Sequence, residues 1–297
     1  MSKIAQLGIS SSKCGYCKSK QSKDQAAIDE HISDEEGGFI CRGYWAQSIL
    51  PKDYQMLLDH GCRRSGEHYI YQPIPDLMCC RPFSIRLKVD EFVPTKSQKK
   101  SIRRFINHFC GNHLHPDEPD IMIRLQKCMD SSEQLDIVLE KSSYKEEAYE
   151  LYKKYQLAIH HDKPEKLTRE QYEDFLVKNS FDTNAPYQGA FHLSWYFHGQ
   201  LIAVGVLDIL PKCLSSVYFF YDPDLSKWSL GTLSALVEIN LAGWLSSHVI
   251  GLKYYYLGLY IDDCPKLNYK ANFGPSQILD PVQYEWIPFE EAKGSLF

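Results

Sequence analysis

Four cysteines carry the first candidate chemistry of this chain. Cys14 and Cys17 form a Cys-x-x-Cys motif, and the adjacent Cys79 and Cys80 follow much later. Two thiolates at the first spacing can hold one side of a tetrahedral metal ion, and a second pair can complete the site. The same four thiolates could hold an iron–sulfur cluster. The alternatives are free buried thiols and a thioredoxin-like redox pair, which the absence of a βαβ pattern around Cys14 disfavours.

A single carboxylate, Asp208, interrupts the apolar run Gln200–Leu210. A second run, Ser215–Tyr221, is rich in β-branched and aromatic residues, and Pro211-Lys212 separates the two. Two such runs predict an antiparallel hairpin that is buried on both faces. Because an isolated buried charge is very costly, Asp208 is a candidate functional residue. The alternative is a structural aspartate that caps the turn.

A run of cations without any acid occupies Lys96–Arg104. On a helix, the charged side chains of this run fall on one stripe. Such a stripe suits a phosphate backbone, although a solvated helix face is the alternative. The cations are Lys96, Lys99, Lys100, Arg103 and Arg104.

Several local patterns predict the elements that position these residues. Pro51–Asp59 reads as a helix with proline in its first turn. The pair Arg63-Arg64 precedes a predicted strand, and Phe83–Val89 alternates as a half-buried strand with a basic outer face. Ser143-x-x-Glu146 and Thr168-x-x-Gln171 read as capping boxes at the starts of two helices.

The totals limit the class of protein. The chain has 297 residues, 44% of them hydrophobic, and a formal charge of −5, which argues against non-specific polyanion binding by the whole molecule. The N-terminus lacks the apolar core of a signal peptide, and no apolar run approaches the ~20 residues of a membrane helix. We therefore expect a cytoplasmic protein, with the nucleus as a second location, whose ten cysteines are thiols or ligands rather than disulfides.

The order of predicted elements suggests an α+β fold with a GNAT-type acyltransferase core. Two helices, a strand, a long hairpin, a helix and another strand follow one another in residues 141–297. A smaller Cys-rich α+β domain covers 1–95, and a basic helix and linker cover 96–140. CoA-binding members of this fold carry a glycine-rich loop before the helix that follows the hairpin. Ser226–Gly231 has one glycine there, so we expect no CoA, and an acyl donor carried by RNA fits the basic stripe.

The sequence resembles the eukaryotic arginyl-tRNA–protein transferases, the arginyltransferases of the N-degron pathway. The matching stretches cover most of both domains in the family's order. They are Cys14–Lys18, Tyr44–Ile49, Arg63–Gly66, Met78–Cys80, Ile85-Arg86, Pro94–Lys100, Tyr149–Pro164, Leu201–Asp224, Leu233–Ile239, Tyr255–Lys270 and Pro275-Ser276.

The resemblance implies transfer of arginine from Arg-tRNA to the α-amine of proteins with N-terminal Asp, Glu or oxidised Cys, which marks them for ubiquitin-dependent degradation. Asp208 is then the expected polar centre of the site, as a general base or as a receptor for the arginyl guanidinium. Glu238 could share that centre. Lys266 and Lys270 are candidates for the tRNA end or the acidic acceptor side chain, and Arg63 and Arg64 are alternatives for that side chain.

The resemblance also assigns the four cysteines to zinc or to an iron–sulfur cluster, and family members are associated with haem as well. The sequence departs from the family pattern by an extra acidic segment, Gln21–Gly38, and by substitutions at three places. Val237 replaces an arginine, Asp262-Asp263 replaces His-Ser, and Ala271 replaces a glycine. The region between the domains is also short for the family.

These departures support a second hypothesis, a non-catalytic metal-cluster sensor that binds tRNA or acidic N-termini. A CoA-dependent N-acetyltransferase ranks third, because the glycine-rich loop is missing. Leucyl transfer, as in related bacterial enzymes, is a variant of the first hypothesis.

Overall fold

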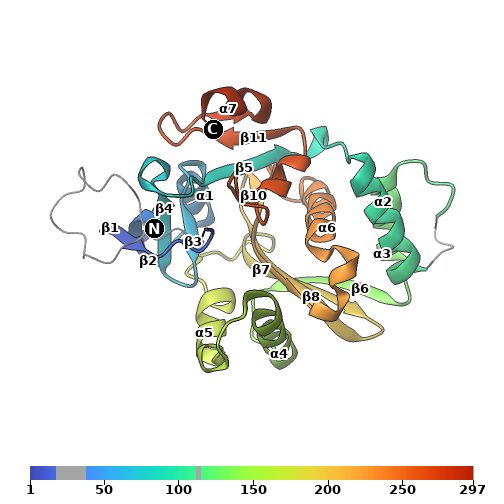
Figure 1. Ribbon diagram of the computed structural model, residues 1–297. Coiled ribbons are helices and arrows are strands. Elements are labelled where there is room, and N and C mark those ends of the chain that lie inside the picture. The colour runs from blue at the N-terminus through green and yellow to red at the C-terminus, as the bar shows by residue number, and fades with distance from the viewer. Residues whose placement is uncertain (18–37, 112–114, 297) are drawn as a thin grey trace. The chain divides into compact units, whose positions relative to one another are not determined.

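The computed structural model describes residues 1–17, 38–111 and 115–296, which divide into two compact units (Figure 1). Unit 1 comprises Met1–Phe92, Ser180–Thr183 and Tyr256–Phe297, and unit 2 comprises Val93–Asn179 and Asn184–Tyr255. This division differs from the three consecutive domains suggested by the sequence. The C-terminal residues belong to unit 1 because strand β11 (Ser276–Leu279) pairs with strand β5 (Phe83–Lys88).

Unit 1 contains two groups of strands. The first is a four-stranded antiparallel sheet in the order β1-β2-β4-β3, in which Arg63 of β3 lies opposite Tyr71 of β4. In the second group the strands follow the order β12-β11-β5-β10. The strands and α-helices of this unit are β1 (Lys3–Ser12), β2 (Phe39–Ser48), α1 (Pro51–Asp59), β3 (Arg63–Ser65), β4 (Tyr69–Pro73), β5, β10 (Tyr254–Tyr260, from Tyr256 onward), β11, β12 (Trp286–Pro288) and α7 (Phe289–Ser295).

Unit 2 is built on the strand order β9-β8-β7-β6, with antiparallel pairing of neighbours. Its α-helices and strands are α2 (Lys96–Phe105), α3 (Ile121–Asp130), β6 (Leu135–Lys141), α4 (Glu146–Tyr155), α5 (Arg169–Tyr172), β7 (Gly189–Phe197), β8 (Gln200–Ile209), β9 (Cys213–Tyr221) and α6 (Leu230–Leu245). Short π-helical turns are η4 (Ile106–Cys110), η5 (Gln156–His160) and η7 (Glu173–Val177), and 3₁₀ helices are η6 (Pro164–Lys166) and η8 (Pro223–Trp228).

The predicted α+β class is confirmed, and the chain from α4 to β10 follows the element order expected of a GNAT-type core. The helices α4 and α5 precede β7, the hairpin β8–β9 follows, and α6 leads to β10. The hairpin itself is confirmed, with Asp208 opposite Ser215 and Leu210 N–H bonded to Cys213 O at 2.8 Å. Every residue of β8 after Gln200 is buried, as expected for a strand covered on both faces.

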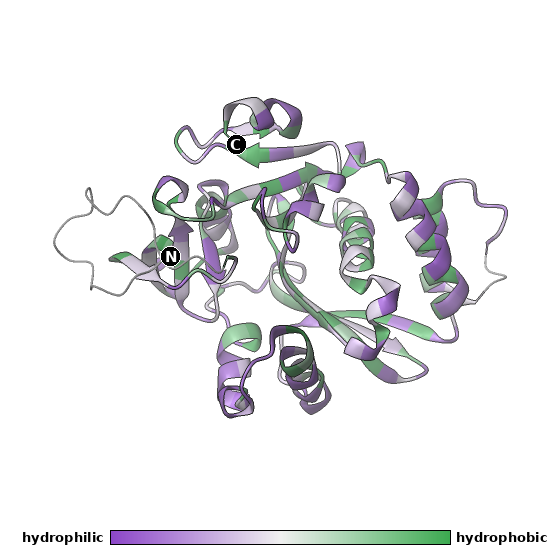
Figure 2. Cartoon of the chain, in the orientation of Figure 1, coloured by the Kyte–Doolittle hydropathy of each residue, from purple (hydrophilic) through white to green (hydrophobic). Residues whose placement is uncertain are grey.

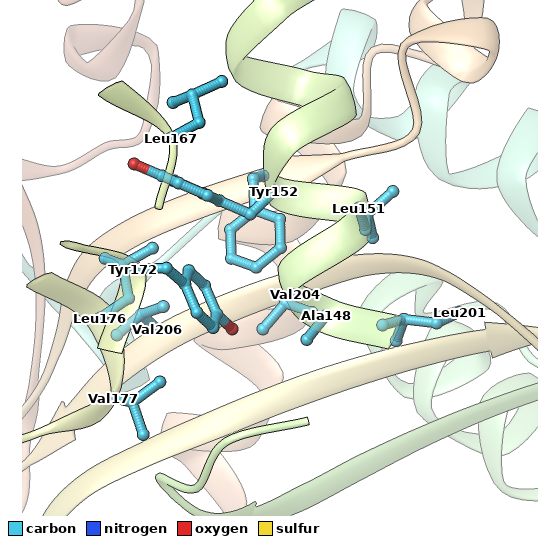
Figure 3. Close-up of a cluster of buried hydrophobic side chains, with 11 residues drawn as sticks. Ala148, Leu151, Tyr152, Leu167, Tyr172, Leu176, Val177, Leu201, Val204 and Val206 are labelled. Carbon is cyan, nitrogen blue, oxygen red and sulfur yellow. The ribbon is translucent and has the colours of Figure 1, made fainter. Parts of the chain in front are cut away.

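One face of β8 and β9 packs against α4, α5 and η7 (Figure 3). The aromatic rings of Tyr152 and Tyr172 lie between these helices and the strands, with ring centroids 5.1 Å apart. Val204 and Val206 of β8 and Phe220 of β9 complete the contact. Truncating one large apolar side chain of such a core to alanine costs about 2–5 kcal/mol, so this cluster fixes the position of β8.

The helix starts confirm only part of the capping analysis. Of the two predicted boxes, the one at α5 is present in part, because Thr168 accepts a hydrogen bond from Gln171 N–H. A capping box that the sequence analysis did not predict, formed by Thr95 and Gln98, begins α2. The predicted box at Ser143 is wrong, because α4 begins after Lys145 and no side chain caps it. In Figure 2, polar residues cover much of α2, whereas α6 is largely apolar. None of the helices in the described residues is long and apolar enough to cross a membrane.

Candidate functional site

Four thiols of unit 1 lie together, as the sequence predicts. The sulfur atoms of Cys14, Cys17, Cys79 and Cys80 all lie within 4.8 Å of one another, and Cys17 Sγ lies 3.4 Å from Cys79 Sγ. In a tetrahedral zinc site with Zn–S bonds of about 2.3 Å, neighbouring sulfurs are about 3.8 Å apart. The four thiols therefore fit a four-coordinate metal ion, and their soft donors equally fit an iron–sulfur cluster.

The backbone around the thiols favours their convergence. Tyr16 N–H donates to Cys14 Sγ at 3.4 Å, and Cys79 N–H donates to Gly38 O at 3.3 Å. A Cβ atom on Gly38 would lie 2.5 Å from Cys79 Sγ, so a side chain at this position would displace that thiol. Burial and the neighbouring thiols raise the pKa of Cys80. A bound cation would reverse this effect, because it stabilises thiolates.

Asp208 is fully buried in β8 of unit 2, with an exposed fraction of 0%. Its direct neighbours on the adjoining strands are Ala190 and Ser215. Side chains alternate along a strand, so Asp208 points to the same face as Val204 and Val206, the face covered by α4 and α5.

Glu238 is also buried, with 1% exposed, but it belongs to the opposite face of the strands. It lies on α6, and a Cβ atom on Gly205 would lie 3.4 Å from its Oε1. Ser234 Oγ donates to Oε1, and Tyr255 OH donates to Oε2 at 2.7 Å. Gly205 and Asp208 are an odd number of positions apart, so the two carboxylates face opposite sides of β8 and we assign them separate roles.

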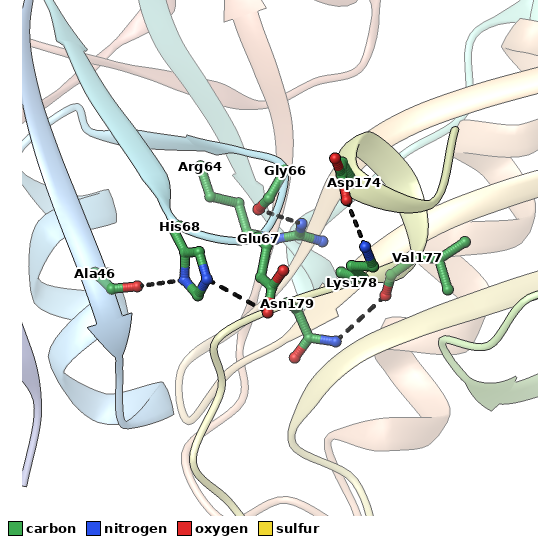
Figure 4. A network of polar contacts seen from close by, with 9 residues as sticks. All are labelled: Ala46, Arg64, Gly66, Glu67, His68, Asp174, Val177, Lys178 and Asn179. Atoms are coloured by element: carbon green, nitrogen blue, oxygen red, sulfur yellow. Dashed lines mark hydrogen bonds and ion pairs between the residues drawn. The ribbon is translucent and has the colours of Figure 1, made fainter. Parts of the chain in front are cut away.

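The arginine pair of β3 is buried in unit 1, and its two side chains have different surroundings. Arg64 Nη1 donates to Gly66 O at 3.4 Å (Figure 4). Its guanidinium lies 6.0 Å from the ring centre of Phe181. Arg63, with 8% exposed, donates from Nη2 to Gly258 O at 3.3 Å.

The other polar contacts drawn in Figure 4 are local within each unit. In unit 1, His68 contacts Ala46 O at 2.9 Å and the carboxylate of Glu67 at 3.5 Å. In unit 2, Lys178 pairs with Asp174 at 2.6 Å, four residues earlier in the chain. Such pairs at partly exposed positions contribute about 0–1 kcal/mol, so we assign them no part in a site.

The two candidate lysines lie in the segment after β10. Lys270 Nζ donates to Leu259 O at 2.9 Å and is half-buried, whereas Lys266 is exposed. Lys270 and Arg63 therefore contact the carbonyl groups of two consecutive residues, Leu259 and Gly258. Unit 1 thus brings one candidate lysine and one candidate arginine to the same end of β10.

The predicted basic helix is confirmed as α2, and four of its five cations are exposed. Arg104 lies 5.3 Å from the ring centre of Trp228 and donates to Lys227 O at 3.4 Å. His108 stacks on the same tryptophan with ring centroids 4.0 Å apart. Burial and the nearby Lys227 lower the pKa of His108, so this cluster carries its charge on Arg104 and Lys227. Sequence reasoning missed the aromatic part of this surface.

The predicted basic outer face of β5 is wrong for Arg86, which is 8% exposed. Arg86 Nη1 donates to Tyr256 OH at 3.0 Å and lies 3.9 Å from Asp59 Oδ1. The guanidinium of Arg86 stacks over Trp286, 4.0 Å from the ring centre. The alternation of β5 was read correctly, but the partners come from distant parts of the chain. No local pattern could reveal them.

Val237, where the resembled family has arginine, is buried on α6 and lines a cavity of about 360 Å³ in unit 2. The remaining lining comes mostly from apolar side chains of α3, β6, β7 and α6, among them Met129, Ile137, Leu193, Leu241 and Trp244.

Comparison with known proteins covers both units. The family described as "Arginine-tRNA-protein transferase, N terminus" matches residues 12–100, and "Arginine-tRNA-protein transferase, C terminus" matches residues 147–280. The chain belongs to the arginyl-tRNA–protein transferase family. The first matched region contains the four cysteines, and the second contains Asp208, Glu238, Lys266 and Lys270.

Three relatives illustrate the range of the family. Arginyl-tRNA–protein transferase 2 of Arabidopsis thaliana is 27% identical over 98% of this chain and 75% of its own length. Arginyl-tRNA–protein transferase 1 of Saccharomyces cerevisiae is 33% identical over 96% of this chain, which spans 63% of that relative. An aspartate/glutamate leucyltransferase of Pseudomonas aeruginosa is 30% identical over 79% of this chain and 82% of its own length. The plant alignment spans 474 positions, so that relative carries internal residues that this chain lacks.

Proposed function

We propose that this protein transfers arginine from Arg-tRNA to the α-amino group of proteins whose N-terminal residue is Asp, Glu or oxidised Cys. The proposal rests on the match of both family regions, in order, along one chain. In this proposal the product carries a new N-terminal arginine, which marks it for ubiquitin-dependent degradation in the cytoplasm or nucleus.

The reaction is aminolysis of an activated ester. The acceptor nitrogen attacks the carbonyl carbon of the arginyl ester, and a C–N bond forms. The bond from that carbon to the 3′-terminal ribose oxygen then breaks, and the proton lost by the amine ends on this oxygen. The α-amino group has a pKa near ~8, so a carboxylate that accepts its proton raises the fraction of reactive amine. No ATP is consumed in this step.

Asp208 is the carboxylate that we place in this reaction. It is the charged residue of the most deeply buried strand of unit 2, where low polarity strengthens electrostatic interactions. It acts as the base or binds the arginyl guanidinium through a bidentate pair. Because its side chain has no exposed surface, either role requires a local opening on the face of Val204 and Val206 when substrate binds.

The remaining candidates take supporting roles in the proposal. The exposed cations of α2 bind phosphates of the tRNA, and the lysines after β10 contact its end or the acceptor. The four thiols would hold zinc or an iron–sulfur cluster, which supplies structural cross-linking of unit 1. The transfer chemistry itself proceeds on side chains and substrate.

The test measures transfer of labelled arginine from Arg-tRNA to matched peptides that begin with Asp, Glu or Ala, using metal-replete protein. We expect transfer to Asp and Glu but not to Ala. A parallel reaction with Leu-tRNA tests the alternative donor suggested by the bacterial relative, and transfer of leucine alone would contradict the arginine assignment. Absence of any transfer, with tRNA still bound, would instead favour the non-catalytic sensor.

A variant series then tests the role of Asp208. We expect Asp208→Asn to lower the transfer rate at least ~100-fold, because the amide neither accepts the amine proton nor pairs with a guanidinium as a charge. The matched control is Asp136→Asn on β6, an exposed aspartate of the same unit, which should keep the wild-type rate. Full activity of a folded Asp208→Asn protein would remove Asp208 from the mechanism.

A further inference from the structure

Arg63 is a buried cation whose hydrogen bonds are incomplete. It exposes 8% of its surface, and Nη2 donates to Gly258 O at 3.3 Å. Its Nε and Nη1 atoms are buried and have no hydrogen-bond partner anywhere in the described residues. A guanidinium has five N–H donors, of which Nε and Nη1 carry three. Three donors of this side chain therefore lack an acceptor.

The groups around Arg63 supply no compensating negative charge. Its guanidinium lies 5.9 Å from the ring centre of Tyr256. Burial raises the pKa of Cys62 to about 11 and also raises the pKa of Tyr71, and Arg63 only partly opposes both effects. Both groups are therefore neutral near pH 7. Among the ion pairs formed by described residues, none includes Arg63.

The nearest comparison within unit 1 is Arg86, which lies 5.7 Å from the same Tyr256 ring. Arg86 has the carboxylate of Asp59 at 3.9 Å, the oxygen of Gln277 at 2.9 Å and the Tyr256 hydroxyl at 3.0 Å. Tyr256 OH itself donates to Asp59. The carboxylate near this ring is thus already engaged by Arg86 and Tyr256.

A buried guanidinium stays protonated, and leaving it without an anion is unfavourable because the buried charge has lost its hydration. A fold that keeps such a group without an internal partner has an anion-binding position. We propose that Arg63 is the receptor for the side-chain carboxylate of the acceptor's N-terminal Asp or Glu, an inference that rests on the proposed function. The sulfinate of an oxidised cysteine also spreads one negative charge over two oxygens that a guanidinium can bind.

Two observations favour a carboxylate over a tRNA phosphate at this position. Arg63 is buried and forms no ion pair with a described residue, unlike Arg86, and its planar fork matches one carboxylate through two parallel hydrogen bonds. The exposed cations of α2, in contrast, form the continuous surface that a phosphate backbone needs.

The experiment compares kcat/KM for peptides beginning with Asp or Asn, and with Glu or Gln, in wild-type, Arg63→Lys and Arg63→Met proteins. We expect the wild type to prefer Asp to Asn at least ~100-fold. Arg63→Met should raise the KM for the Asp peptide until the preference disappears, and Arg63→Lys, which keeps the charge but loses the fork, should retain a small part of it. Arg81→Gln, at an exposed arginine paired with Asp76, is the matched control and should keep the wild-type preference.

The outcomes separate this inference from the proposed function. If the wild type transfers arginine but Arg63→Met still discriminates Asp from Asn, Arg63 is not the receptor. If Arg63→Met weakens Arg-tRNA binding equally with every peptide, the guanidinium binds phosphate and the inference is overturned. Absence of transfer by the wild type contradicts the proposed function itself. Thermal melting of both Arg63 variants verifies that they are folded. If Arg63→Met does not fold, Arg63→Lys still tests the inference.

Discussion

Glu238 of unit 2 and Arg63 of unit 1 are both charged residues in the interior, yet their surroundings differ. Glu238 accepts hydrogen bonds from the hydroxyls of Ser234 and Tyr255, both within its own unit. Arg63 donates to one carbonyl and leaves Nε and Nη1 without acceptors. The comparison shows that burial of a charge does not by itself indicate function. What distinguishes a binding position from a structural one is whether the protein supplies the partners.

The cysteines repeat this contrast. Cys110 and Cys128 of unit 2 are buried thiols, and burial and the nearby Cys128 raise the pKa of Cys110 to about 12, so they are neutral core residues. The four thiols of unit 1 meet in one place, where their ionised forms repel one another unless a cation binds. Unit 1 therefore contains the four thiols and Arg63, and both of these groups are incomplete without a ligand.

The largest expected effect comes from the four thiols. We expect Cys79→Ser, or removal of metal with a chelator, to abolish stoichiometric metal binding and to lower the free energy of unfolding by several kcal/mol. Structural zinc contributes about 10–16 kcal/mol in zinc-finger peptides near neutral pH, and loss of one of four ligands forfeits a large part of it. Elemental analysis and urea unfolding measure the two quantities.

The matched control for this variant is Cys62→Ser, at a buried thiol of unit 1 outside the four-cysteine group. It should keep the metal content and lose only packing energy, about 1–2 kcal/mol. Equal metal loss in both variants would show that the unit unfolds rather than that the ligand is missing.

The sequence was sufficient for several local patterns, although the capping box predicted at Ser143 is wrong. The Cys-x-x-Cys motif, the β8–β9 hairpin and the helix α2 follow from spacing and periodicity alone, and the structure confirms their geometry. The four thiols are an exception to locality, because the second pair is distant in sequence. Their shared chemistry nevertheless made the pairing predictable.

The rest depends on contacts between distant residues, which periodicity does not encode. Arg86 alternates correctly in β5 but is buried by Asp59, Tyr256 and Trp286. Likewise, Arg63 and Arg64 are neighbours of the same type, and only the structure shows that their surroundings differ. The strand register separates Glu238 from Asp208, although both are carboxylates in apolar segments.

The next effect concerns Glu238, the partnered charge of the comparison. We expect Glu238→Leu to lower the free energy of unfolding by about 3 kcal/mol, because the hydroxyls of Ser234 and Tyr255 would lose their acceptor in the interior. Urea unfolding of the metal-replete protein measures this loss.

The matched variant Glu238→Gln keeps an acceptor oxygen, so its free energy of unfolding should fall by less than that of Glu238→Leu. Transfer activity per folded molecule should stay within a few-fold of wild type in Glu238→Gln. If Glu238→Gln unfolds normally but loses transfer as completely as Asp208→Asn, Glu238 belongs to the reacting centre rather than to the support of α6.

The smallest expected effect is an increase in stability, and it concerns Arg63, the residue of the comparison whose donors lack acceptors. We expect Arg63→Met to raise the free energy of unfolding by about 1 kcal/mol, because it replaces an incompletely bonded buried cation with an apolar side chain that matches the arginine stem. The matched variant Arg86→Met should lower it by about 3 kcal/mol, since Asp59 would lose its cationic partner. Urea unfolding of both proteins, with metal bound, gives the two values.

If Arg63→Met destabilises the protein as strongly as Arg86→Met, Arg63 is a structural cation like its neighbour. A variant without Arg63 that is more stable but no longer prefers acidic acceptors is the result expected if Arg63 serves to bind a ligand.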